Sequence, residues 1–147
     1  MGTIFLSMLI GCQKSTEVEQ VFTFPKAPYP PEEAIENGDV VNLHGEISNL
    51  QKLNDFVEHV KTGSEDEILI TSYTVEGDPI LDYLKYDGHQ IQYAHDNSQD
   101  AFGGSDTGVS STTCSSIQLK EREDRLEYNL SDCASDVGQN FYFAVPK

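Results

Sequence analysis

The sequence predicts an α+β fold in which an antiparallel meander sheet carries one main helix packed on a face. One segment, residues 49–62, repeats its apolar side chains at helical spacing. The segments after it alternate apolar and polar residues over short runs, as half-buried strands do. Turn residues such as Asp87-Gly88 separate these runs, so successive strands are expected to pair as hairpins.

The first part of the predicted domain contains a short helix, a strand and then the main helix. Proline opens and glycine ends a helical turn at residues 30–38, and acidic residues fill its first turn. Residues 39–45 alternate as a strand. The main helix is expected to be capped at Ser48 or Asn49 and to end at Gly63. Its apolar stripe consists of Leu50, Leu53, Phe56, Val57 and Val60.

The rest of the chain is predicted as strands joined by turns and one long loop. Residues 67–75 are rich in β-formers and are placed at the centre of the sheet. The Asp87-Gly88 turn predicts a register that pairs Leu84 with Ile91. The loop is expected at residues 96–111. The remaining strands are expected at residues 80–86 and 89–95, in a hairpin joining the last two cysteines, and at residues 141–145.

The N-terminal residues resemble a bacterial lipobox. An apolar run ends in Leu9-Ile10-Gly11-Cys12, which supplies a small residue before a thiol that can accept lipid. Residues 1–11 are therefore predicted to be a lipoprotein signal peptide and residues 12–30 a lipidated Cys12 followed by a flexible, polar tether. No basic residue precedes Cys12, which leaves open a start further upstream or an N-terminal strand with an ordinary cysteine. Residues 31–147 are predicted to form a single domain on the extracytoplasmic face of the cell membrane.

The net charge of the chain limits the classes of partner that it is expected to bind. It carries 25 acidic and nine basic residues, a net charge of −16, and no Lys or Arg lies between Tyr86 and Leu119. Nucleic-acid binding is not expected, because phosphate neutralisation needs clustered Lys and Arg. We expect attachment to the membrane through the lipid on Cys12, and a cation or a cationic protein or peptide as partner. The alternative is that the charge only keeps a monomer soluble.

Three cysteines are present, and lipidation of Cys12 would leave a pair. A two-residue turn at residues 123–124 sets Cys114 opposite Cys133, which predicts a disulfide, with two free buried thiols as the alternative. In this register both cysteines fall on the opposite face from Ile117. Either that face is covered near the strand ends, or a bulge shifts the pairing there.

No motif in the chain predicts an enzyme, a cofactor or a metal centre. Asp106-Thr107-Gly108 has the letters of an aspartic-protease motif, which leaves a hydrolase as a third hypothesis, but glycines rather than an apolar strand precede it. Asp96-x-Ser98-x-Asp100 spaces oxygen ligands at alternate positions, but the glycine and glutamate of an EF-hand are missing. Exposure and charge nevertheless make five acids candidates for binding a cation or ligand: Glu76, Asp78, Asp96, Asp100 and Asp106.

Four segments together resemble a family of small uncharacterised lipoproteins from Gram-positive bacteria. They are G-D-V-V-N-L-H-G, I-T-S-Y-T-V-E-G-D-P-I, Y-D-G-H-Q-I and S-T-T-C-S-S-I, at residues 38–45, 70–80, 86–91 and 111–117. The resemblance implies location and fold and lends no catalytic residues. The function expected from the sequence is a lipid-anchored, extracytoplasmic, non-enzymatic binding domain of unknown ligand. The alternative is an inhibitor of a cationic cell-wall hydrolase such as lysozyme.

Overall fold

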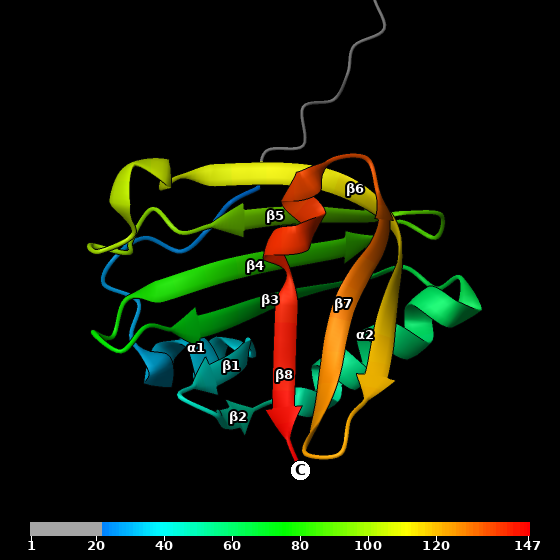
Figure 1. Cartoon of the computed structure of the whole chain (residues 1–147), viewed down its shortest axis with the longest axis horizontal. Coiled ribbons are helices and arrows are strands. Elements are labelled where there is room, and N and C mark those ends of the chain that lie inside the picture. The colour runs from blue at the N-terminus through cyan, green and yellow to red at the C-terminus, as the bar shows by residue number, and fades with distance from the viewer. Residues whose placement is uncertain (1–21) are drawn as a thin grey trace, which may run out of the picture.

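The computed structural model describes residues 22–147, so the predicted signal peptide and Cys12 lie outside the described residues. Eight strands form one sheet in the order β2-β1-β3-β4-β5-β6-β7-β8 (Figure 1). The elements are α1 (Pro31–Asn37), β1 (Val40–Leu43), β2 (Glu46–Ser48), α2 (Leu50–Thr62), β3 (Asp66–Tyr73), β4 (Pro79–Tyr86), β5 (Ile91–Asp96), the 3₁₀ turn η1 (Gly104–Asp106), β6 (Val109–Glu121), β7 (Arg125–Cys133), the 3₁₀ turn η2 (Asp136–Asn140) and β8 (Tyr142–Pro146).

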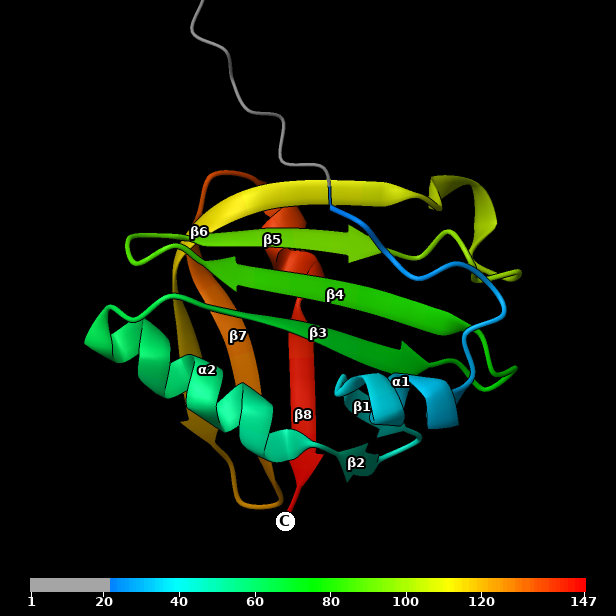
Figure 2. The same cartoon turned by 180° about the vertical axis from the view of Figure 1, so that it is seen from behind.

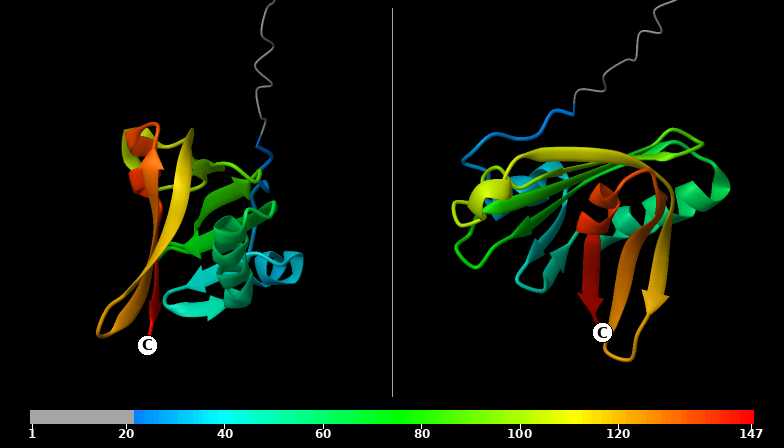
Figure 3. Two further views of the ribbon diagram at one scale, coloured as in Figure 1. Left: turned by 90° about the vertical axis from the view of Figure 1, so that its right-hand side faces the viewer. Right: turned by 45° about the horizontal axis from the view of Figure 1, so that its top comes forward.

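The predicted antiparallel meander with one helix on a face is wrong. Strands hold 44% of the described residues and helices 22%, and the sheet curls into a nearly closed barrel. The β6–β8 part of the sheet faces the β3–β5 part across the core (Figure 3). The pairing is not purely antiparallel either, because α2 connects β2 to β3 and returns the chain parallel to β1.

The length of β6 explains why the sheet curls. Its first half pairs with β5 and its second half pairs with β7, and Cys114 belongs to both ladders. The Ser115–Asp132 rung is missing from the second ladder, and Asp132 has a φ of 54°. A strand that bends in this way passes from one layer to another and makes a corner. Beyond the corner, β7 and β8 run across the direction of β3, β4 and β5 (Figure 1).

Helix α2 covers the open side of the barrel with its apolar face. The predicted bounds are confirmed, with Gly63 left-handed after the last turn. Its buried side chains Leu53, Phe56 and Val57 pack with residues from both parts of the sheet, and the helix contacts β1, β3 and β6 (Figure 2). The helix therefore closes the core of a curled sheet instead of covering a flat one. No described helix has the length and apolarity that a membrane span requires.

A second cluster covers the outer face of the sheet. Residues 22–30, which the sequence assigned to the tether, run along this face (Figure 2) and bring in Tyr29, which is buried. The Tyr29 hydroxyl donates to Asp39 (2.8 Å), and so does the Thr71 hydroxyl (2.7 Å). The Tyr73 hydroxyl donates to the Tyr29 carbonyl (2.8 Å). Burial raises the pKa of Tyr29 to about 12. Part of the predicted tether thus belongs to the packed structure.

The β4–β5 hairpin differs from its predicted register. Leu84 pairs with Tyr93 rather than Ile91, and Ile91 pairs with Tyr86. The Asp87 carboxylate accepts the backbone N–H groups of both residues 89 and 90 (2.8 Å each), and the Asp87 N–H donates to the residue 90 carbonyl (3.2 Å). Asp87 therefore extends the hairpin, and the turn moves one residue along the chain.

The predicted disulfide is confirmed. Cys114 and Cys133 are bonded, with their Cα atoms 3.9 Å apart, in the register that was expected. Of the two explanations offered for their position, the covered face holds, and no bulge shifts the pairing, because the ladder keeps one register on both sides of the missing rung. The ladder is interrupted next to them, and η2 covers them, since a Cβ on Gly138 would clash with the Cys133 sulfur. The disulfide therefore holds the corner and supports η2.

Replacing both cysteines by alanine, Cys114→Ala with Cys133→Ala, should lower the free energy of unfolding by about 3 kcal/mol, because the loop between them regains freedom in the unfolded chain. Urea unfolding measures this. The matched control is Ser116→Ala with Ser131→Ala, a hydrogen-bonded pair on the same ladder, for which about 1 kcal/mol is expected. Equal losses in the two double variants would contradict a special role for the cross-link.

Candidate functional site

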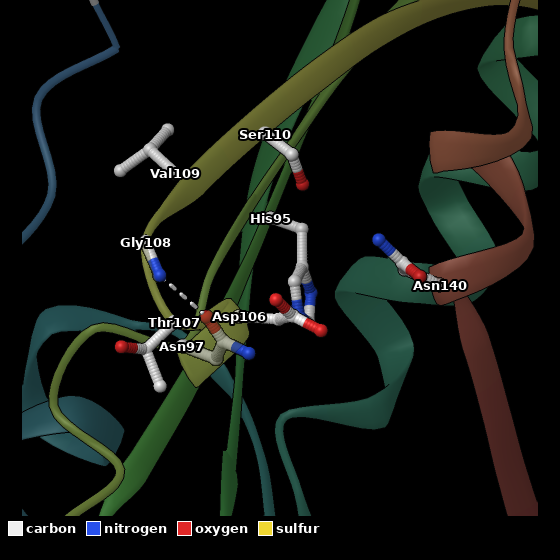
Figure 4. Close-up of a pocket in the computed structure, with 8 residues that line it drawn as sticks. All are labelled: His95, Asn97, Asp106, Thr107, Gly108, Val109, Ser110 and Asn140. Atoms are coloured by element: carbon white, nitrogen blue, oxygen red, sulfur yellow. Dashed lines mark hydrogen bonds between the residues drawn. The ribbon is translucent and has the colours of Figure 1, made fainter. Parts of the chain in front are cut away.

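A polar pocket lies at one end of the barrel, between the end of β5, the start of β6 and η2. Its volume is about 500 Å³. Figure 4 shows the side chains of Asp106, Ser110 and Asn140 directed toward the space around His95, whereas Val109 points away. The residues that line the pocket are His95, Asn97, Asp106, Thr107, Gly108, Val109, Ser110 and Asn140. Elements distant in sequence thus meet at this site.

His95 is oriented from behind by Asp82. The two residues are direct partners in the β4–β5 ladder. Asp82 Oδ1 accepts hydrogen bonds from His95 Nδ1 (2.7 Å) and from the Tyr93 hydroxyl (2.6 Å). The side chains of His95 and Asp82 are only 15% and 13% exposed. Because Nδ1 is bonded to Asp82, Nε2 is the nitrogen left for a ligand.

The surroundings of His95 favour its charged form. The hydrogen bond to Asp82 raises the pKa of His95, although burial acts in the opposite direction. Burial also raises the pKa of Tyr93, which therefore stays a hydroxyl donor. Tyr93 is fully buried and its ring meets the edge of Phe141, with centroids 5.8 Å apart. This packing connects the hydrogen-bonded residues Asp82, Tyr93 and His95 to Phe141, which directly follows η2.

The floor of the pocket is a loop closed by Asn97. Its Oδ1 accepts the Gly108 N–H (2.8 Å), and its own N–H donates to the Gly108 carbonyl (3.3 Å). These bonds bring Asp106, at the end of η1, to the mouth of the pocket (Figure 4). With His95 paired to Asp82, Asp106 is the carboxylate that lines the pocket without a hydrogen bond among the described residues. The site therefore offers one negative charge and several hydroxyl and amide groups.

The structure does not bring the five predicted acids together as one site. Asp106 lines the pocket, and Glu76 lies exposed in the turn between β3 and β4. The other three hold backbone N–H groups: Asp96 accepts from residue 98 (2.8 Å), Asp100 from residue 102 (3.0 Å) and Asp78 from residue 101 (3.0 Å). Within residues 22–147, no three His, Cys, Asp or Glu side chains are placed to share a metal ion.

Sequence reasoning missed the Asp82–Tyr93–His95 network. The sequence alone assigned His95 no functional role. The β4–β5 register could have revealed this network, because it places Asp82 opposite His95. That register follows only when the turn is placed at residues 88–89. Asn140 had no signal, because η2 reaches the pocket only through the curl of the sheet.

The raised pKa of His95 predicts how stability depends on pH. Its folded pKa lies above the unfolded value of about 6.5. The stability that charged His95 adds to the folded protein is therefore complete below pH 6.5, and it is lost as the pH rises through the folded pKa. Urea unfolding between pH 6 and 9 should show this loss, and His95→Gln should remove it. Titration of the His95 ring by NMR checks the cause, and a pKa at or below 6.5 would refute it.

Residues 37–129 match the model of a family described as "Domain of unknown function (DUF4362)". Comparisons with curated proteins and with solved structures find no match.

Proposed function

The chain belongs to the DUF4362 family, whose description gives no activity, and we therefore propose a function from the site: a non-enzymatic domain that binds a cationic group in the pocket beside His95. The observation that carries the proposal is a pocket of about 500 Å³ that joins β5, β6 and η2 and contains one carboxylate, Asp106, and no Lys or Arg among the described residues of its lining.

An ammonium or guanidinium group matches this pocket best. It would donate to the Asp106 carboxylate and to the oxygens of Ser110 and Asn140. The His95–Asp82 pair contributes no net charge when the histidine is protonated, so Asp106 sets the sign of the site. The stretch from Tyr86 to Leu119 supplies no Lys or Arg to compete with such a ligand.

Binding without catalysis is favoured by how His95 is placed. An Asp–His pair activates a nucleophile when a hydroxyl or thiol lies within hydrogen-bond reach of the free ring nitrogen. In residues 22–147 the hydrogen bonds of the His95 ring go to Asp82 and Tyr93. Ser110 sits opposite His95 in the β5–β6 ladder without a hydrogen bond to the ring. We interpret the pair as a fixed part of the pocket wall, and Asp106, Ser110 and Asn140 as the groups that bind the ligand.

We further propose that the domain works outside the cell, tethered by lipid on Cys12. Two features support this location: the lipobox-like run that ends at Cys12, and a disulfide at the corner of the sheet. Disulfides of this structural kind persist in oxidising compartments.

The cation proposal is tested with two blocked amino acids, Nα-acetyl-arginine amide and Nα-acetyl-lysine amide, with Nα-acetyl-glutamine amide as the neutral comparison. We expect the two cationic compounds to shift NMR resonances of His95, Asn97 and Asn140. Asp106→Asn should weaken this binding at least about tenfold, since the partnered charge is lost. Glu76→Gln removes an equal charge outside the pocket and should leave binding unchanged. Shifts of equal size with the glutamine compound would contradict the proposal.

A further inference from the structure

Two loop tips at the same end of the molecule expose large apolar side chains. Val75, in the β3–β4 turn, is 88% exposed, and Phe102, in the β5–β6 loop, is 74% exposed. Both loops project beyond the ends of their strands on one side of the barrel (Figures 1 and 2). Phe102 belongs to neither core cluster, so most of its apolar surface remains free for a partner.

The two tips are held in place. The Asp78 carboxylate accepts the Ala101 N–H (3.0 Å), which links the β3–β4 turn to the β5–β6 loop. Within the turn, the Thr74 hydroxyl accepts the Asp78 N–H (3.1 Å). Within the loop, the Phe102 N–H donates to the Asp100 carboxylate (3.0 Å). A surface that is already ordered loses less conformational freedom when a partner binds.

Acidic side chains surround these apolar tips. Glu76 follows Val75, and Asp78 and Asp100 are the carboxylates that order the two loops. Lys26 brings one positive charge to this rim. The residue before it, Pro25, is held beside the β5–β6 loop because its carbonyl accepts a hydrogen bond from the Gln99 side chain (3.0 Å). Three carboxylates against one lysine leave the rim negative. The favoured partner therefore combines apolar side chains with Lys or Arg.

We propose that this tip patch, formed by Val75, Glu76, Asp78, Asp100 and Phe102, docks an amphipathic basic segment of another protein. Phe102 and Val75 contact the apolar side chains of the segment, and the carboxylates face its Lys and Arg residues. The patch is separate from the proposed pocket, because none of its five residues lines that pocket.

The test uses an amphipathic peptide of leucine and lysine, with poly-lysine of the same charge as a purely cationic comparison. Calorimetry should show that the peptide binds more tightly than poly-lysine. Phe102→Ser and Val75→Ser should each weaken peptide binding about tenfold, as expected for apolar anchors at an interface. Raising the salt concentration from 0.05 to 0.3 M should weaken it further by screening the rim.

Two controls separate the patch from other effects. Leu119→Ser changes an apolar side chain that is also exposed (45%) but lies on the β6–β7 hairpin, and it should bind the peptide normally. Asp106→Asn removes any contribution of the pocket to lysine binding but should keep the tighter binding of the peptide relative to poly-lysine, so failure of the pocket proposal and failure of this one give different results. Any one of three results would overturn the tip patch as a docking site. They are absence of peptide binding, equally tight binding of poly-lysine, and undiminished peptide binding by Phe102→Ser.

Discussion

The corner in β6 at Cys114 is the constraint on which the rest of the structure depends. Cys114 pairs with Ile91 on one side and with Cys133 on the other, so one residue belongs to both parts of the sheet. The strand must turn where the two ladders meet, and the disulfide fixes β7 to it at that point. Without the turn, β7 and β8 would extend the sheet sideways and leave α2 and the apolar face of β3–β5 exposed to water.

The pocket exists because of this turn. The curl brings η2 and Phe141 over β5, where Phe141 packs on Tyr93 and Asn140 reaches the space around His95. The side chains at this end of β4 and β5 change from apolar to polar, from Leu84 and Tyr93 to Asp82 and His95. The core therefore ends in a hydrogen-bonded network that separates it from the pocket. The same network that completes the core places the histidine in the wall of the pocket.

Local signals allowed several features to be predicted. The caps and apolar stripe of α2 gave its bounds, and the turn at residues 123–124 gave the register that unites the cysteines. The curl could not be predicted, because the first half of β6 is S-S-T-T, which shows no apolar alternation and resembles a loop. The parallel pairing of β1 with β3 depends on where α2 packs, which is a tertiary effect. The role of His95 could not be predicted, because its partner Asp82 is distant in sequence and adjacent only through the hairpin register.

The position of η2 along the chain has a consequence for the order in which the molecule is assembled. Most neighbours in the sheet are also consecutive in sequence, so strands can add one after another as the chain emerges. The last described segments, η2 and β8, are then the ones that cover the disulfide and supply Asn140. A chain that has reached β7 possesses His95, Asp82 and Asp106 but lacks the wall of the pocket that Asn140 supplies. The pocket is therefore completed only when η2 and β8 join a sheet whose other strands are already in place.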